Sequence, residues 1–155
     1  MNHTAENALI VGAFLTTILL PVYLVIRQSS KKRKAKLTER LNTVINDHNL
    51  SLTRSEQIGN KMIGWDQPNK ILVLADNNQP EVEVNDLKQA SKCYVLRNMS
   101  GNSVRSIFLQ IVDPHNKLLC SIPCYEQFVD NEMKLKRVDQ QVRDWEQLLN
   151  AHLVK

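Results

Sequence analysis

The sequence predicts an α+β domain carried behind an N-terminal transmembrane helix. Residues 8–26 contain no charged side chain, which is typical of a membrane span. From residue 50 onward, short apolar or alternating runs are broken by turn residues roughly every ten positions, as in antiparallel strands. The last segment returns to helical spacing. We therefore expect an α+β domain of seven antiparallel strands followed by a C-terminal helix.

The expected span consists of 19 uncharged residues from Ala8 to Ile26, twelve of them Leu, Ile, Val or Phe. A helix of that length measures about 28 Å, close to the ~30 Å hydrocarbon core of a bilayer. Pro21 predicts a local kink, which membrane helices tolerate. Residues 1–7 would then form a short N-terminus on the outer side.

The basic stretch at residues 27–36 predicts the orientation of this span. A cleaved signal peptide carries its cations before the apolar run, but Met1–Asn7 has no Lys or Arg. Cations that follow a span are retained inside, so we expect the N-terminus outside and the C-terminal domain in the cytoplasm. We also expect these cations to contact anionic head groups without specificity. They are Arg27, Lys31, Lys32, Arg33, Lys34 and Lys36.

The positive charge of the chain is confined to that stretch. It holds six of the 20 Lys and Arg residues, and Glu6 is the one acid before residue 37. Residues 37–155 therefore hold 14 Lys and Arg against 15 Asp and Glu. A neutral domain lacks the basic surface that nucleic-acid binding requires, so no nucleic-acid partner is expected.

Residues 37–48 predict an amphipathic helical connector. Leu37, Leu41, Val44 and Ile45 follow the spacing of one helix face. This stripe either packs on the following domain, serves as a plain stalk, or pairs with a second copy as a short coiled coil.

The soluble domain is expected to cover residues 50–153. Asn, Gly, Asp and Pro separate its apolar runs, in keeping with turn chemistry. The expected strands are Leu50–Gln57, Lys61–Trp65, Lys70–Ala75, Glu81–Val84, Lys92–Arg97, Val104–Val112 and Lys117–Ile122.

The C-terminal segment predicts an amphipathic helix that covers the sheet. Its apolar positions are Val138, Val142, Trp145, Leu148 or Leu149, and His152. An antiparallel sheet needs such a cover for its apolar face. We expect Val142, Trp145, Leu148 and Leu149 to cap the sheet, with Trp145 at the centre.

Seven strands followed by one helix with a central Trp145 resemble the pleckstrin-homology-like superfold, and the resemblance covers roughly Leu50 to Leu153. The plan of an anchor before a small domain also resembles uncharacterised bacterial single-pass membrane proteins. Inositol-lipid-binding members of the superfold carry several cations around the first strand–strand loop. The matching segment Gln57–Met62 has one, Lys61. The resemblance thus implies the fold, a seven-stranded antiparallel partly open barrel or sandwich capped by the C-terminal helix. It also implies a scaffold for protein contacts, and argues against inositol-lipid binding.

The chain shows no motif for catalysis, metal or nucleotide binding, so we expect neither an enzyme nor a cofactor. Cys120 and Cys124, with His115 and Cys93, are the nearest approach to a zinc ligand set, but Cys120 lies in an apolar run. Cys124 follows Pro123 and is expected to be the most exposed thiol.

Three aromatic residues are candidates for partner contact: Trp65, Tyr125 and Phe128. Each also fits core packing, and the sequence leaves both interpretations open. The leading functional hypothesis is a membrane-anchored cytoplasmic interaction or scaffold module. The alternative is a tethered domain that binds a lipid or small hydrophobic molecule in a cavity between its sheets and helix.

Overall fold

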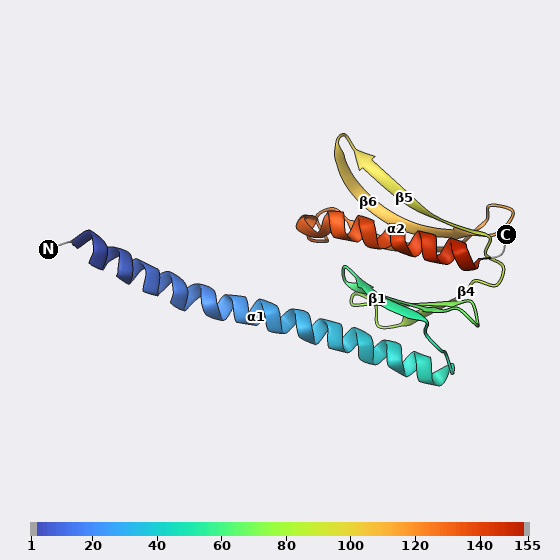
Figure 1. Cartoon of the computed structure of the whole chain (residues 1–155), viewed down its shortest axis with the longest axis horizontal. Coiled ribbons are helices and arrows are strands. Elements are labelled where there is room, and N and C mark those ends of the chain that lie inside the picture. Colours follow the sequence, from blue (N-terminus) through green and yellow to red (C-terminus); the bar gives the residue numbers. More distant parts are fainter. Residues whose placement is uncertain (1–2, 154–155) are drawn as a thin grey trace. The chain divides into compact units, whose positions relative to one another are not determined.

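The structure is a computed structural model that describes residues 3–153, without the side chains of residues 3–18, 22, 24–27 and 30. It divides into two compact units, residues 1–36 and 37–155. Helix α1, His3–Asp47, runs through the first unit and into the second. Every other helix and strand that the structure describes belongs to the second unit, which carries the candidate site (Figure 1).

The predicted span at residues 8–26 lies within α1, but most of its side chains are outside the described residues. Leu19, Leu20 and Tyr23 are described and exposed. Among the residues that were described, no helix contains an apolar stretch long enough to cross a membrane.

Seven antiparallel strands of the second unit form two sheets, which confirms the predicted α+β class. The strands are joined into the orders β1-β2-β3-β4 and β5-β6-β7, and no closed barrel forms among the described residues. The bounds are β1 Arg54–Ile58, β2 Lys61–Asp66, β3 Ile71–Asp76, β4 Val82–Asp86, β5 Lys92–Ser100, β6 Ser103–Val112 and β7 Leu118–Glu126.

The largest differences from the predicted strand ranges are at the start of β1 and at the end of β7, and both follow from packing. Strand β1 begins at Arg54 rather than Leu50, because Leu50 and Leu52 pack with α1. Strand β7 continues to Glu126, and a bulge at Cys124 lets it do so: Ile107 pairs with Tyr125 while Phe108 pairs with Pro123. Such a bulge leaves one residue unpaired and re-aims those after it.

The central strands β2 and β3 of the β1–β4 sheet are buried, and the end of α1 covers their outer side. Leu37 and Leu41 are buried there against Met62, Val73 and Ala75. The connector stripe therefore packs on the domain, and the compact unit begins at Leu37. Gly64 allows the close approach of the preceding segment, since a Cβ at that position would lie 2.6 Å from Leu52 Cδ1.

The main core lies between the two sheets and helix α2, Leu135–His152, which follows the short 3-10 helix η1, Glu132–Lys134. Trp65, Tyr125 and Trp145 are its largest side chains. Of the residues expected to cap the sheets, Val142, Trp145 and Leu149 are buried, and Leu148 is partly buried against the core.

Helix α2 joins the edges of the two sheets, as Figure 1 shows. Toward β5, the Asn150 amide accepts from the Cys93 N–H and donates to the Cys93 carbonyl, both at 2.8 Å. Toward β1, Gln141 and the Trp145 indole donate to Glu56 at 2.6 and 3.1 Å. We call this line of contacts the α2 seam.

Glu56 is the polar centre of the seam. Arg54 pairs with it at 2.9 Å and lies 5.3 Å from the centre of the Trp145 ring. Burial of the Glu56 carboxylate favours a higher pKa, but the hydrogen bonds from Gln141, Arg54 and Trp145 outweigh that effect and hold the pKa below its ordinary value. The carboxylate therefore stabilises the seam in its charged form.

Candidate functional site

The three cysteines offer no reactive or ligating site. Cys93, Cys120 and Cys124 are all free and buried, so the prediction that Cys124 is the exposed thiol is wrong. The bulge before Tyr125 places Cys124 in the core. Burial raises the pKa of Cys120 to about 11 and that of Cys124 to about 12, which leaves both protonated and poorly nucleophilic.

The side chains that the structure describes form no metal-binding group either. None of their clusters brings together three or more His, Cys, Asp or Glu that could hold an ion. His115 lies in the exposed turn between β6 and β7, where its N–H donates to Asp113.

The basic stretch before the second unit is exposed where its side chains are described. Lys31, Lys32, Arg33, Lys34 and Lys36 all face solvent. The Arg27 side chain lies outside the described residues.

The three predicted contact aromatics separate clearly by burial. Trp65 is fully buried and Tyr125 is 2% exposed, so both belong to the core. Phe128 is 90% exposed and is the only one of the three available to a partner.

A five-residue turn after β7 presents Phe128 to solvent. The Asp130 N–H donates to the Glu126 carbonyl at 2.9 Å, and the Asp130 carboxylate accepts from the Glu126 N–H at 2.8 Å. The Gln127 N–H ties the turn to β6 through the Arg105 carbonyl at 2.8 Å. Phe128 at the apex has φ +69°, a left-handed conformation that a bulky side chain rarely adopts. The turn thus holds an exposed aromatic ring at a backbone cost.

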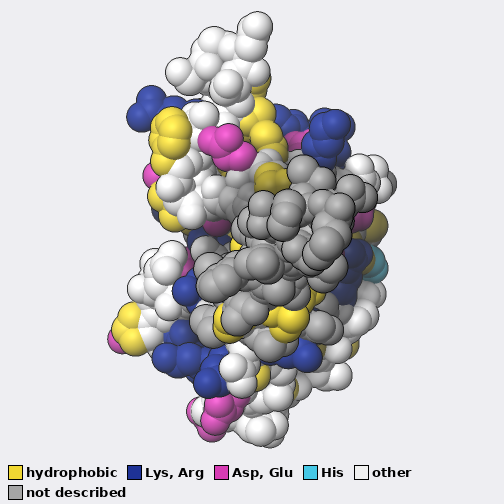
Figure 2. Space-filling view, turned by 90° about the vertical axis from the view of Figure 1, so that its left-hand side faces the viewer, with side chains coloured by type: hydrophobic (Ala, Val, Ile, Leu, Met, Phe, Trp, Pro, Cys, Tyr) yellow, Lys and Arg dark blue, Asp and Glu magenta, His cyan; other side chains and the backbone are white. Residues whose placement is uncertain are grey.

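Three other large apolar side chains are exposed in the segments around Phe128. Val129 follows it in the chain, Met133 lies in η1, and Met99 lies at the end of β5 next to Ser100. Figure 2 shows one face of the molecule on which hydrophobic side chains lie next to Lys and Arg and to Asp and Glu. We call Met99, Arg105, Phe128, Val129 and Met133 the Phe128 surface.

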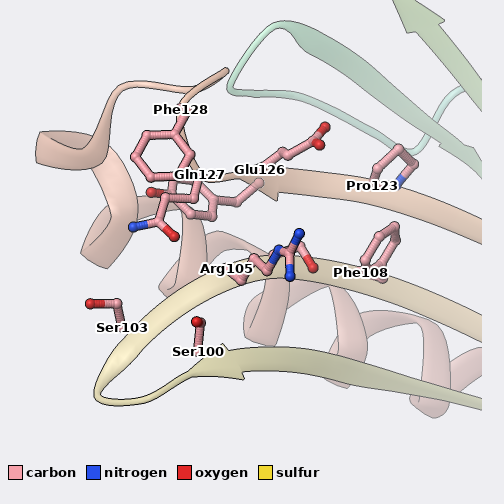
Figure 3. Close-up of a pocket in the computed structure, with 10 residues that line it drawn as sticks. Ser100, Ser103, Arg105, Phe108, Pro123, Glu126, Gln127 and Phe128 are labelled. Carbon is pink, nitrogen blue, oxygen red and sulfur yellow. The ribbon is translucent and has the colours of Figure 1, made fainter.

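A hollow of about 600 Å³ lies at the centre of this surface. Figure 3 shows it between the β5–β6 hairpin and the chain that leaves β7. Phe108 and Pro123, which pair across β6 and β7, line it on the sheet, and Phe128 lines it from the loop. The full lining is Ser100, Ser103, Arg105, Ser106, Phe108, Pro123, Tyr125, Glu126, Gln127 and Phe128.

Arg105 is the one cation on the wall of the hollow. Its side chain is exposed, and it forms no ion pair or side-chain hydrogen bond with any residue the structure describes. Glu126 also lines the hollow, but its carboxylate points away from the Arg105 guanidinium (Figure 3). The cation is therefore available to a ligand.

Helix α2 covers the first part of the β5 edge. Asn150 satisfies both backbone groups of Cys93, and Glu146 accepts from the Val95 N–H at 3.2 Å. Side chains of α2 thus occupy the groups of Cys93 and Val95 that an incoming strand would need. The Phe128 surface remains the best-supported candidate site.

Sequence reasoning included Phe128 among the candidates but missed Arg105 and Met133. Arg105 lies inside an expected strand and Met133 follows an acidic turn, and neither position carries a motif. A usable signal was the apolar pair Phe128-Val129 within a polar loop, since loops between elements are usually polar.

Comparisons of the chain with protein-family models, with curated proteins and with solved structures found no match.

Proposed function

We propose that this chain is a membrane-anchored cytoplasmic interaction module whose Phe128 surface binds a protein partner. The observation that carries the proposal is the exposed ring of Phe128 beside an open hollow. An exposed apolar cluster of this kind marks interaction sites in folded proteins. Fold stability does not explain it, because the ring is 90% exposed and its backbone is strained.

The strand order supports a pleckstrin-homology-like domain as the scaffold. Four antiparallel strands are followed by three more and then by a helix that joins the sheet edges. Folds of this kind host many functions, so the partner must be inferred from the surface and not from the fold.

The apolar run Ala8–Ile26 and the cations after it support the anchor and the orientation. Alkaline carbonate extraction of membranes tests this part. The full chain should remain in the membrane pellet, and a chain lacking residues 8–26 should not. A full chain released by carbonate would contradict the anchor.

Site-directed photo-crosslinking of the full chain in its own cells tests the binding surface. A benzoylphenylalanine at Phe128 should give a discrete, light-dependent protein adduct. The matched control is Leu118, which is 50% exposed at the start of β7 and outside the hollow. Equal adduct patterns from both positions, or lipid adducts alone from position 128, would contradict a protein-binding surface.

A small hydrophobic ligand is the second candidate, because a hollow of about 600 Å³ has the size of known ligand pockets. It lies at the surface and not between the sheets and α2, where we expected a cavity. Native mass spectrometry of the purified chain tests this candidate. A stoichiometric small molecule that is lost in Phe128→Ala would favour it over a protein partner.

A further inference from the structure

Resting on the proposed function, we propose that the hollow binds a peptide segment in which an acidic residue lies next to an apolar side chain. Arg105 receives the carboxylate, and Phe108 and Phe128 receive the apolar side chain. This chemistry of the partner goes beyond the proposed function, which requires only that some protein binds the Phe128 surface.

The charge on the wall of the hollow selects for an acid. Arg105 offers a planar guanidinium that matches a carboxylate in a bidentate geometry. Two other Arg side chains at the sheet edges already have acidic partners: Arg54 pairs with Glu56, and Arg97 pairs with Asp139. Arg105 has none among the described residues, although it lies in the same domain.

The apolar side of the hollow lies within reach of the same ligand. Phe108 lies on β6 three residues after Arg105, and both line the hollow with Phe128. The rings and the guanidinium therefore face one space (Figure 3). An apolar side chain next to a carboxylate is the smallest peptide unit that fills both parts.

The polar lining suits a peptide backbone better than an alkyl chain. Ser100 and Ser103 supply hydroxyls that can donate or accept, and Gln127 supplies an amide. The Ser106 hydroxyl also lines the hollow but already accepts from the Asn98 amide at 2.9 Å. A peptide carries backbone donors and acceptors that can pair with these groups. An alkyl ligand would leave them unpaired, at a cost in free energy.

A bilayer surface is the competing occupant, because the proposed anchor at residues 8–26 would hold the domain near a membrane. Against a bilayer, the carboxylates of Asp130 and Glu132 follow Phe128 closely in the chain, and an anionic leaflet would repel them.

Selection from a displayed library of random twelve-residue peptides tests the proposal. The bait is the full chain in phosphatidylcholine nanodiscs, so that the anchor is retained. We expect enrichment of Asp or Glu directly beside Leu, Ile, Phe or Met. One selected peptide is then synthesised for titration against four variants.

Arg105→Glu should weaken that peptide at least tenfold, and a fresh selection on this variant should enrich Lys or Arg at the acidic position. Phe128→Ala should weaken the peptide by roughly 10- to 100-fold, as expected for losing most of a buried aromatic contact. Glu126→Gln should strengthen it a few-fold by removing a nearby like charge. Lys117→Glu, in the exposed turn outside the hollow, should leave it unchanged. Circular dichroism of each variant shows whether it is folded.

Failure to enrich any acidic–apolar pair, or equal binding of the peptide to Arg105→Glu, would overturn the proposal. Binding of phosphatidylserine vesicles by the chain that depends on Phe128, without peptide enrichment, would assign the surface to the bilayer. A discrete protein adduct from position 128 together with a failed selection would leave the proposed function standing and reject only the acidic–apolar chemistry.

Discussion

The α2 seam and the Phe128 surface lie on the same domain but use their side chains in opposite ways. In the seam, Glu56, Gln141 and Asn150 each bond to a partner within the fold. On the Phe128 surface, Arg105 has no ionic partner among the described residues, and Phe128 is held exposed in a strained conformation. Contacts within the fold therefore account for the side chains of the seam. They do not account for Arg105 and Phe128, and these two residues indicate a function.

A substitution in the seam is expected to cause the largest loss of stability. Trp145→Ala removes a fully buried ring from the core and its hydrogen bond to Glu56. The free energy of unfolding should fall by about 3–5 kcal/mol. Urea unfolding of the full chain in detergent, followed by circular dichroism, measures this. A loss below about 1 kcal/mol, the size of an ordinary surface effect, would show that α2 does not hold the sheets together.

The seam should also give the domain part of its acid sensitivity. In the folded protein the pKa of Glu56 lies below its ordinary value of 4.5. The charged carboxylate therefore stabilises the fold fully at a pH above its pKa in the unfolded chain. This stabilisation is lost as the pH falls through the pKa in the folded chain. Glu56→Gln should cost about 1 kcal/mol at pH 7 and flatten the fall in stability below pH 5. Urea midpoints measured from pH 7 to pH 3 test this. Parallel curves for the two proteins would contradict a charged Glu56 in the seam.

Substitutions on the Phe128 surface should leave stability almost unchanged. Met133 is 93% exposed, so Met133→Ser should change the free energy of unfolding by less than about 0.5 kcal/mol. The same change should weaken the protein adduct formed from position 128, because it removes an apolar contact beside Phe128. The matched control is Leu118→Ser, which should leave the adduct intact. If Met133→Ser leaves the yield of the adduct unchanged, the partner contacts the hollow and not Met133.

Periodicity and turn chemistry in the sequence are enough to predict much of this fold. Each of the seven strands overlaps its predicted range, because the short apolar runs of β2, β3 and β6 and the turn residues between strands are local signals. Leu50 was misassigned to a strand because its packing against α1 is a tertiary contact that alternation does not encode. The bulge at Cys124 likewise depends on the pairing of β6 with β7.

The candidate site was less predictable than the fold. Phe128 was one of three aromatics between which the sequence did not choose, since burial depends on where β7 ends. Arg105 has no local signal, because its availability follows from the absence of an ion pair with any residue that the structure describes, and that depends on the tertiary structure. Both properties arise from how β6, β7 and the following turn meet.

Phe128→Gly tests the central claim most directly, because stability and binding can be measured on the same sample. Glycine relieves a left-handed backbone that costs about 1–2 kcal/mol for other residues, and little burial is lost with a ring that is 90% exposed. The account predicts that the free energy of unfolding rises or holds while affinity for the selected peptide falls at least tenfold. Asn116→Gly, at φ +59° outside the hollow, is the control and should leave affinity unchanged. A Phe128→Gly protein that is less stable and binds the peptide normally would show that Phe128 serves the fold and not a partner.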